Sequence, residues 1–159
     1  MSLLQPAATG INSSNIKLHN ISAILLNLLH NTNVSRVSLA QLLGVSTATI
    51  TNLVSELVEQ GLIVEEGFIR NNGQTNVGRP QKALSLVPNS RFAIGIHIDV
   101  GRVYITLTNI RGEVIDQRTF EHQLNTAWQQ LRNQGVGVAE SMIADINVHQ
   151  QKIVGVGLG

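Results

Sequence analysis

The chain contains no cysteine, which excludes disulfides and thiolate metal sites within it. Charged residues make up only 13% of the 159 positions and aromatic residues only 3%. No apolar run reaches the length of a membrane span, and the N-terminus lacks the basic and apolar segments of a secretory signal. We therefore expect a cytoplasmic protein without a membrane partner. Its hydrophobic fraction of 43% is enough for a globular core.

The net charge of +1 is low for a protein that binds nucleic acid. Up to residue 90 there are five positive side chains, Lys17, Arg36, Arg70, Arg79 and Lys82, against four glutamates. Neutralisation of phosphates supplies most of the non-specific affinity for DNA, so one copy with this charge should bind weakly. A DNA-binding function would need its charges on one face and two copies on a two-fold site.

The stretch SRVSLAQLLGVSTATITNLVSELVEQGL predicts two helices joined by a tight turn. The second helix, over residues 47–60, has the spacing of one buried stripe in Ile50, Leu53, Val54, Leu57 and Val58. The first helix is shorter and is expected to bury Leu39, Leu42 and Leu43. Ser35 and Ser46 are predicted N-caps, and Gly44 and Gly61 are predicted to end the helices in the left-handed conformation.

Short, mostly polar side chains lie opposite the buried stripe of the second helix: Thr47, Ala48, Thr51, Asn52 and Ser55. Most of them are poor helix formers, so an exposed helix needs another reason to carry them. A helix in the major groove of DNA supplies one, because Asn can pair with adenine and Thr or Ala methyls can contact thymine. Together with Ser46 they are candidate DNA contacts. An ordinary polar helix corner is the alternative.

After Gly61 the pattern changes to that of a β-hairpin, with strands expected over residues 62–69 and 83–87. Its long tip, RNNGQTNVGRPQK, carries three candidate DNA contacts, Arg70, Arg79 and Lys82. Arg79 stands before proline and is therefore expected to be extended, a form that can enter a narrow minor groove. A loop with incidental charge is the alternative. Arg36 is equally suited to a phosphate contact and to simple exposure to solvent.

The remaining segments complete two regions. Residues 1–14 lack periodicity and are expected to form a flexible leader, and residues 15–30 a helix with the stripe Ile21, Ile24, Leu25, Leu28 and Leu29. Beyond a linker at 88–91 we expect three antiparallel strands (92–100, 103–109, 113–120), a helical region (125–149) that Gly135 and Gly137 break or kink, and a strand (153–159) beside the first. One helix covers only one face of such a sheet, so we expect a fragment of a larger domain whose open edge and face invite pairing with another copy.

Four segments of the chain carry a family resemblance: SRVSLAQLLGVSTATITNLVSELVEQGLIVEEG, VGRPQKALSLVP, AIGIHIDVGRVYITLTNIRGEVI and IVGVGLG. In their order and spacing, from about Asn15 onward, the chain resembles the ROK family of transcriptional regulators. The Gly-Arg-Pro wing followed by three strands is the specific part. The resemblance implies an α+β protein, with a winged helix-turn-helix DNA-binding domain over 15–88. It also implies an incomplete actin-like α/β domain (sugar-kinase or RNase H-like) over 89–159. Regulators of this family typically respond to sugars and repress carbohydrate-utilisation genes.

Kinase members of this family open the second domain with Gly-x-Asp-x-Gly-Gly-Thr, which approaches the phosphates of ATP. Laid on this chain without gaps, the pattern meets Gly95, His97, Asp99, Val100 and Gly101. A carboxylate and a branched side chain at the phosphate-facing positions would oppose nucleotide binding by charge and bulk. The resemblance therefore implies DNA binding without ATP binding, no enzymatic activity and no cofactor.

The expected partners are a double-stranded DNA operator and a second copy, as a homodimer or higher homo-oligomer. A sugar effector is expected only if the rest of the sensor domain is present. The sugar-contacting acidic residue and the zinc motif of the family would lie beyond Gly159. His97, His122 and His149 are too scattered for a metal site, so none is assigned. Two alternatives remain open, a sugar kinase of the same family and a winged helix that binds protein.

Overall fold

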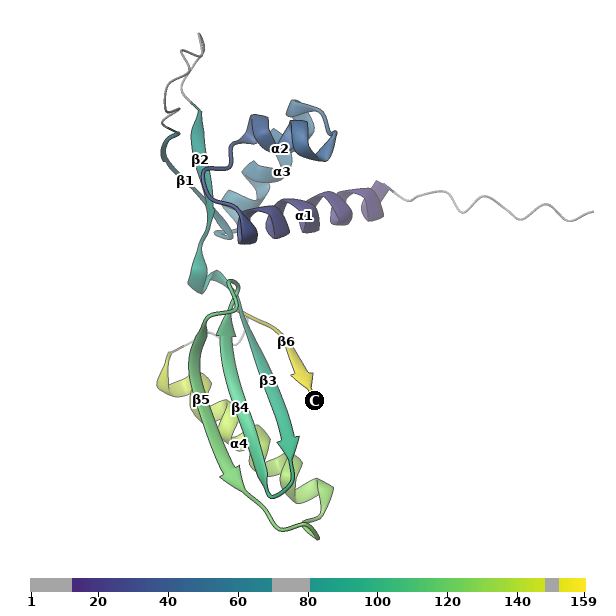
Figure 1. Cartoon of the computed structure of the whole chain (residues 1–159), viewed down its shortest axis with the longest axis vertical. Helices are drawn as coiled ribbons and strands as arrows, with labels where there is room; N and C mark the ends of the chain where they lie inside the picture. The colour runs from purple at the N-terminus through teal and green to yellow at the C-terminus, as the bar shows by residue number, and fades with distance from the viewer. Residues whose placement is uncertain (1–12, 70–80, 148–151) are drawn as a thin grey trace, which may run out of the picture. The chain divides into compact units, whose positions relative to one another are not determined.

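The computed structural model describes residues 13–69, 81–147 and 152–159 (Figure 1). It has the mixed helix and sheet composition expected from the sequence. The contacts divide the chain into two compact units, Met1–Val58 with Glu65–Ser85 and Glu59–Val64 with Leu86–Gly159. None of the helices in the described ranges combines the length and apolar character that crossing a membrane requires.

The first unit begins with α1 (Ser13–His30), which starts two residues before the predicted position and ends where predicted. Its apolar stripe is only partly buried. Ile24 and Leu28 are buried, whereas Leu29 is 37% exposed, so the burial expected for Leu29 is wrong. The helix is apolar on several sides, and periodicity alone does not identify which of them faces the core.

Helix α2 (Arg36–Leu43) forms because local side chains satisfy both of its ends. Ser35 accepts a hydrogen bond from the amide of Ser38 while the Ser38 hydroxyl accepts one from the amide of Ser35, which makes a capping box. Gly44 ends the helix at φ 63°, as predicted. The predicted burial of Leu42 is wrong: it is 64% exposed, because the face that contacts the core is formed by Leu39 and Ala40.

Helix α3 (Thr47–Glu59) carries the clearest buried face of the unit. Ile50, Leu53, Val54 and Leu57 are buried, as the spacing predicted, whereas Val58 is only half-buried. Ser46 caps the helix, since its hydroxyl accepts the amide of Thr49 at 3.1 Å. Gly61 follows at φ 68°, which confirms its left-handed conformation.

Strands β1 (Ile63–Phe68) and β2 (Lys82–Leu86) pair as a two-stranded sheet. The amide of Ile69 donates to Gln81 O, and the amide of Val87 donates to Leu62 O, so the strands run antiparallel. Both strands lie within the predicted hairpin, but Lys82, which the sequence assigned to the tip, is the first residue of β2. Residues 70–80, which include Gly78, Arg79 and Pro80, lie outside the described residues.

The second unit is a four-stranded sheet in the order β5-β4-β3-β6, with strands β3 (Phe92–Asp99), β4 (Arg102–Asn109), β5 (Val114–Glu121) and β6 (Ile153–Leu158). The antiparallel pairing of β3, β4 and β5 confirms the predicted meander. Strand β6 pairs with β3 in parallel, as expected for a strand that returns after a helix. The segment predicted as a linker forms the 3-10 turn η1 (Pro88–Ser90), whose Pro88 O accepts the amide of Ile110.

Helix α4 (Trp128–Asp145) covers one face of this sheet and buries Met142 against Ile105 and Leu107. The break predicted at Gly135 and Gly137 is wrong, because the helix runs through both residues without interruption. Gly135 is buried against β4, and a Cβ added there would lie 3.9 Å from Ile105 Cδ1. This glycine therefore marks the close approach of the helix to the sheet.

Arg118 joins β5 to α4. Its guanidinium donates to Asp116 at 2.9 Å on its own strand, and to Ser141 at 2.9 Å and Asp145 at 2.8 Å on the helix. Asp145, and less strongly Asp116, raise the pKa of Arg118 above its ordinary value.

Strand β6, on the other side of the sheet order, is largely exposed. The side chains of Val154, Val156 and Leu158 are each more than half exposed.

Candidate nucleic-acid interface

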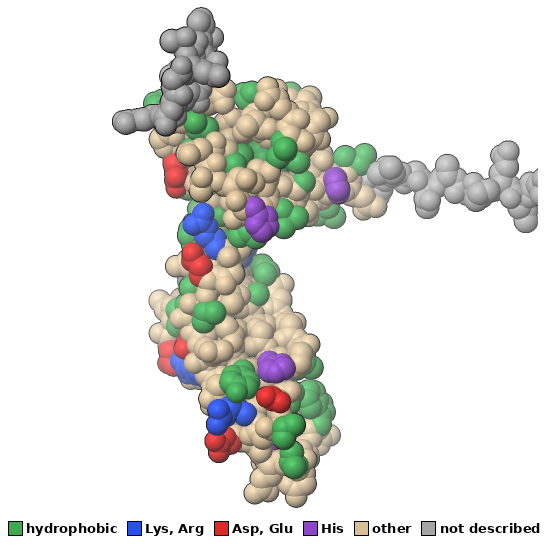
Figure 2. Space-filling model, viewed as in Figure 1, with side chains coloured by type: hydrophobic (Ala, Val, Ile, Leu, Met, Phe, Trp, Pro, Cys, Tyr) green, Lys and Arg blue, Asp and Glu red, His purple; other side chains and the backbone are tan. Residues whose placement is uncertain are grey.

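The candidate interface is the face of α3 that points away from the core. Every residue predicted from the sequence to lie on this face is exposed: Ser46, Thr47, Ala48, Thr51, Asn52 and Ser55. The opposite face of the same helix is buried, so the orientation of the helix is fixed by its apolar stripe. The visible surface over α2 and α3 consists mainly of uncharged side chains and backbone (Figure 2). This surface presents hydrogen-bonding groups and methyls without long charged side chains.

The turn before α3 is short because Gly44 ends one helix and Ser46 caps the next. The hydroxyls of Ser46 and Thr49 also lie 2.8 Å apart. These local bonds leave the first turn of α3 accessible, with Thr47 and Ala48 at its start. A helix N-terminus of this kind favours anions, because its free amides and its dipole point outward.

Arg36 does not lie free in solvent. Its Nε donates to Glu65 Oε1 at 3.0 Å, and its Nη2 lies 2.9 Å from the same oxygen. Its Nη1 donates to Thr51 O at 2.8 Å and to Ser55 Oγ at 3.0 Å. The Arg36 side chain is 24% exposed and that of Glu65 is 27% exposed. The structure therefore places Arg36 between α3 and β1.

Lys82 is held by the other oxygen of the same carboxylate, at 3.0 Å from Glu65 Oε2, but its side chain remains 55% exposed. Lys82 and then Arg36 lower the pKa of the Glu65 carboxyl from its ordinary value of 4.5, against the opposing effect of its partial burial. A hollow of about 570 Å³ lies beside this cluster and is also lined by Val37, Phe68 and Gln81.

Each Lys and Arg in the described part of the first unit has a carboxylate partner. Lys17 pairs with Glu56 at 2.8 Å, and Arg36 and Lys82 share Glu65. The two remaining candidate cations, Arg70 and Arg79, lie outside the described residues. The described surface of this unit is therefore nearly neutral, in agreement with the low net charge of the sequence.

Sequence reasoning missed two residues that organise this region. Glu65 gathers both cations, and Gln81 accepts a hydrogen bond from the Ser35 hydroxyl at 2.6 Å. All three contacts join residues far apart in the sequence, so no local pattern indicates them. The only available signal is the alternation in β1, which places the adjacent Glu65 and Glu66 on opposite faces of the strand.

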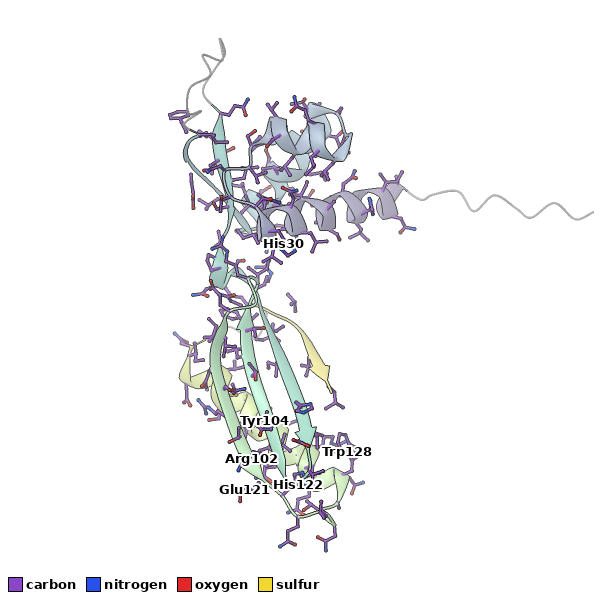
Figure 3. All side chains as sticks on the ribbon, in the orientation of Figure 1. His30, Arg102, Tyr104, Glu121, His122 and Trp128 are labelled. Carbon is purple, nitrogen blue, oxygen red and sulfur yellow. The ribbon has the colours of Figure 1, made fainter. Side chains whose placement is uncertain are left out.

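The segment compared with the kinase phosphate loop lies at the end of β3 and in the following turn. Asp99 Oδ1 accepts the amide of Val100 at 2.7 Å, and Gly101 has φ 78°. His122 Nε2 lies 3.0 Å from Asp99 O, so the turn is joined to the end of β5. This end of the sheet also holds Arg102, which donates to Glu121 at 3.2 Å (Figure 3).

His97 and His122 lie in different local surroundings. The rings of His97 and Tyr104 are tilted by 32° with their centroids 6.1 Å apart, and His122 bonds to backbone oxygens. Across the described ranges no three His, Cys, Asp or Glu side chains are grouped so as to hold a metal ion. His149 lies outside the described residues.

No family model matches the chain. It is 27% identical over 93% of its length to a protein of Caldicellulosiruptor bescii named xylose repressor, of which it covers 36%. It is 32% identical over 63% of its length to a xylose repressor of Bacillus spizizenii, covering 25% of that protein. It is also 30% identical over 80% of its length to an uncharacterised protein of Sinorhizobium fredii, covering 31% of it.

Among solved structures with a similar fold is one described as a ROK family transcriptional regulator, a homologue of the Escherichia coli MLC protein. It aligns at a TM-score of 0.67 and 17% sequence identity. The alignment covers 90% of this chain and 35% of that one. The chain thus spans about a third of the length of the proteins that it matches over most of its own. These comparisons confirm the predicted resemblance: over nearly all of its length the chain is similar to part of a protein named xylose repressor, and it has the fold of part of a ROK-family regulator.

Proposed function

We propose that this chain is the DNA-binding part of a sugar-responsive transcriptional repressor. The observation that carries the proposal is the exposed face of α3, where short polar and methyl-bearing side chains stand on a helix whose other face is buried. The similarity to proteins named xylose repressors supports it.

In this proposal the first unit is a winged helix-turn-helix domain. Helix α3 enters the major groove, where Asn52 pairs with adenine and the methyls of Thr47, Ala48 and Thr51 contact thymine. Strands β1 and β2 form the wing. Arg70 and Arg79 at its tip contact the minor groove and the adjacent phosphates, and Lys82 contacts a phosphate at its base.

Two copies on a two-fold operator would compensate for the small charge of one copy, because their phosphate contacts add. The second unit would form part of the actin-like sensor domain, and sugar binding to the complete domain would shift the dimer to a geometry that misfits the operator. Such a repressor acts in the cytoplasm. The relatives named as regulators favour this function over a sugar kinase, for which an ATP-dependent sugar phosphorylation assay is the direct test.

The test is selection of duplexes from a random-sequence pool by the purified chain, followed by titration of the selected and a scrambled duplex at two salt concentrations. DNA binding predicts an affinity that falls steeply with salt and a smaller salt dependence when Arg79 is changed to Ala. If no duplex is bound in a salt-sensitive manner, the proposal is wrong and a protein partner becomes the better hypothesis.

The variant Asn52→Ala tests base recognition directly. If Asn52 pairs with adenine, the variant should lose roughly 1–3 kcal/mol of discrimination at one base pair. The matched control is Asn125→Ala, which removes an exposed Asn from the second unit. An unchanged base preference in Asn52→Ala would remove Asn52 from the interface.

A further inference from the structure

The contacts of Arg36 differ from those of a side chain available to DNA. Of the five N–H groups that a guanidinium carries, its Nε–H and both hydrogens of Nη1 are directed to acceptors in the same unit, and Nη2 lies 2.9 Å from Glu65 Oε1. A phosphate held by two nitrogens of this guanidinium would have to displace Glu65 or leave Thr51 O and Ser55 Oγ without this donor. A partly buried charged pair loses more when it is broken than an exposed one does.

These contacts join three elements at one point. Arg36 stands at the start of α2, its Nη1 bonds lie one turn apart on α3, and Glu65 belongs to β1. Thr51 and Ser55 flank Asn52, the residue that we propose to read a base. The turn of α3 that is proposed to recognise DNA is therefore the turn held by this guanidinium.

Neighbouring bonds attach the start of α2 to β2 and β2 to Glu65. The Ser35 hydroxyl donates to Gln81 at 2.6 Å, and the amide of Leu84 donates to Val34 O at 2.8 Å, so the start of α2 is attached to β2. Lys82 ties the second oxygen of Glu65 to the same strand. Through Glu65, the bonds of Arg36 to Thr51 and Ser55 form a polar link between α3 and the β1–β2 sheet.

We propose that Arg36 and Glu65 form a brace that sets the position of α3 relative to the wing, so that Arg36 acts on DNA recognition as a positioning residue and not as a phosphate contact. This inference rests on the proposed DNA-binding function. According to this inference, Arg36 and Glu65 affect which DNA sequence is bound although their charges cancel.

The two roles of Arg36 predict opposite effects of Glu65→Gln. If Glu65 only masks Arg36, its loss frees the guanidinium and raises affinity for any duplex. If the pair is a brace, its loss lets α3 shift, so affinity for the selected duplex falls relative to that for the scrambled duplex. The matched control is Glu66→Gln, which makes the same charge change at the next residue of β1, on the opposite face of the strand.

The experiment titrates the full chain and its variants with the duplex selected by the wild type and with a scrambled duplex of equal length. Glu65→Gln also releases Lys82, which raises affinity for both duplexes alike, so the quantity compared is the ratio of selected-duplex to scrambled-duplex affinity. For Glu65→Gln we expect this ratio to be on the order of 3- to 10-fold below that of Glu66→Gln. Arg36→Lys should lower the ratio in the same way, because lysine keeps the charge but loses the planar fork. An equal ratio in the two Gln variants would overturn the proposal.

A second measurement separates this inference from the function on which it rests. Urea unfolding of Arg36→Lys, Glu65→Gln and the double variant tests the brace without DNA. The double variant should change the unfolding equilibrium constant by less than the product of the single changes. Additive changes would overturn the brace whether or not the chain binds DNA, whereas a wild type that binds no duplex would overturn the proposed function.

Discussion

The two glycines inside α4 allow a test of how closely this helix approaches the sheet. Gly135 is buried against β4, with the position of an added Cβ 3.9 Å from Ile105 Cδ1. Gly137 is exposed, and an added Cβ would meet no atom within 4 Å. Both residues lie in the helix interior, so replacing either by alanine removes the same backbone penalty and differs only in what the new methyl contacts.

The expected magnitudes follow from these contacts. Gly137→Ala should stabilise the second unit by about 0.8–1 kcal/mol, the difference between glycine and alanine in a helix interior. Gly135→Ala should add to this the burial of one methyl in ordinary van der Waals contact, worth up to ~0.8 kcal/mol, for a total of about 1–2 kcal/mol.

Urea unfolding followed by tryptophan fluorescence measures these differences, because the chain has one tryptophan, Trp128, at the start of α4. The midpoint should rise for both alanine variants at a constant denaturant slope. A lower midpoint for Gly137→Ala would mean that the helix needs glycine to bend there. A lower midpoint for Gly135→Ala alone would mean that the helix lies closer to β4 than the structure shows.

Three further predictions concern single side chains. Leu39→Ala should destabilise the first unit by about 2–5 kcal/mol in thermal or urea unfolding, whereas Leu42→Ala, at a 64% exposed residue, should stay within about 0.5 kcal/mol of wild type. The pKa of Glu65 is lower in the folded state than its ordinary value of 4.5, so the ionised carboxylate stabilises the fold fully above that pH and less as the pH falls through the folded pKa. The stability difference between wild type and Glu65→Gln should therefore shrink on acidification. A difference that stays constant with pH would contradict this. Arg118→Ala should lower the midpoint of urea unfolding, and by less in high salt; an equal decrease at low and high salt would exclude an electrostatic contribution.

The sequence alone predicted the parts of this fold that depend on neighbours within about one helical turn. The capping residues Ser35 and Ser46 and the left-handed Gly44 and Gly61 act on backbone groups a few residues away, so their roles can be read from residue type and position. The buried stripe of α3 was equally predictable, because only one side of this helix is apolar.

Other features depend on which surfaces meet, and these the sequence left undetermined. A glycine inside a helical pattern predicts a break as readily as a close contact, and the distance to Ile105 decides between them at Gly135. Similarly, Leu42 fits a helical repeat, but the face that α2 turns to the core leaves it in solvent. Periodicity defines a set of faces and does not choose among them.

For the candidate site, the residue types of the exposed α3 face could be identified from the sequence, because they follow from the position of the buried stripe. The environment of Arg36 could not, since its partners Thr51, Ser55 and Glu65 are 15, 19 and 29 positions away. The sequence determined that a charge stands at the start of α2. The tertiary structure brings the Glu65 carboxylate and two oxygens of α3 residues within 3.0 Å of that guanidinium. Only this arrangement shows that the charge is bound by groups of the protein itself.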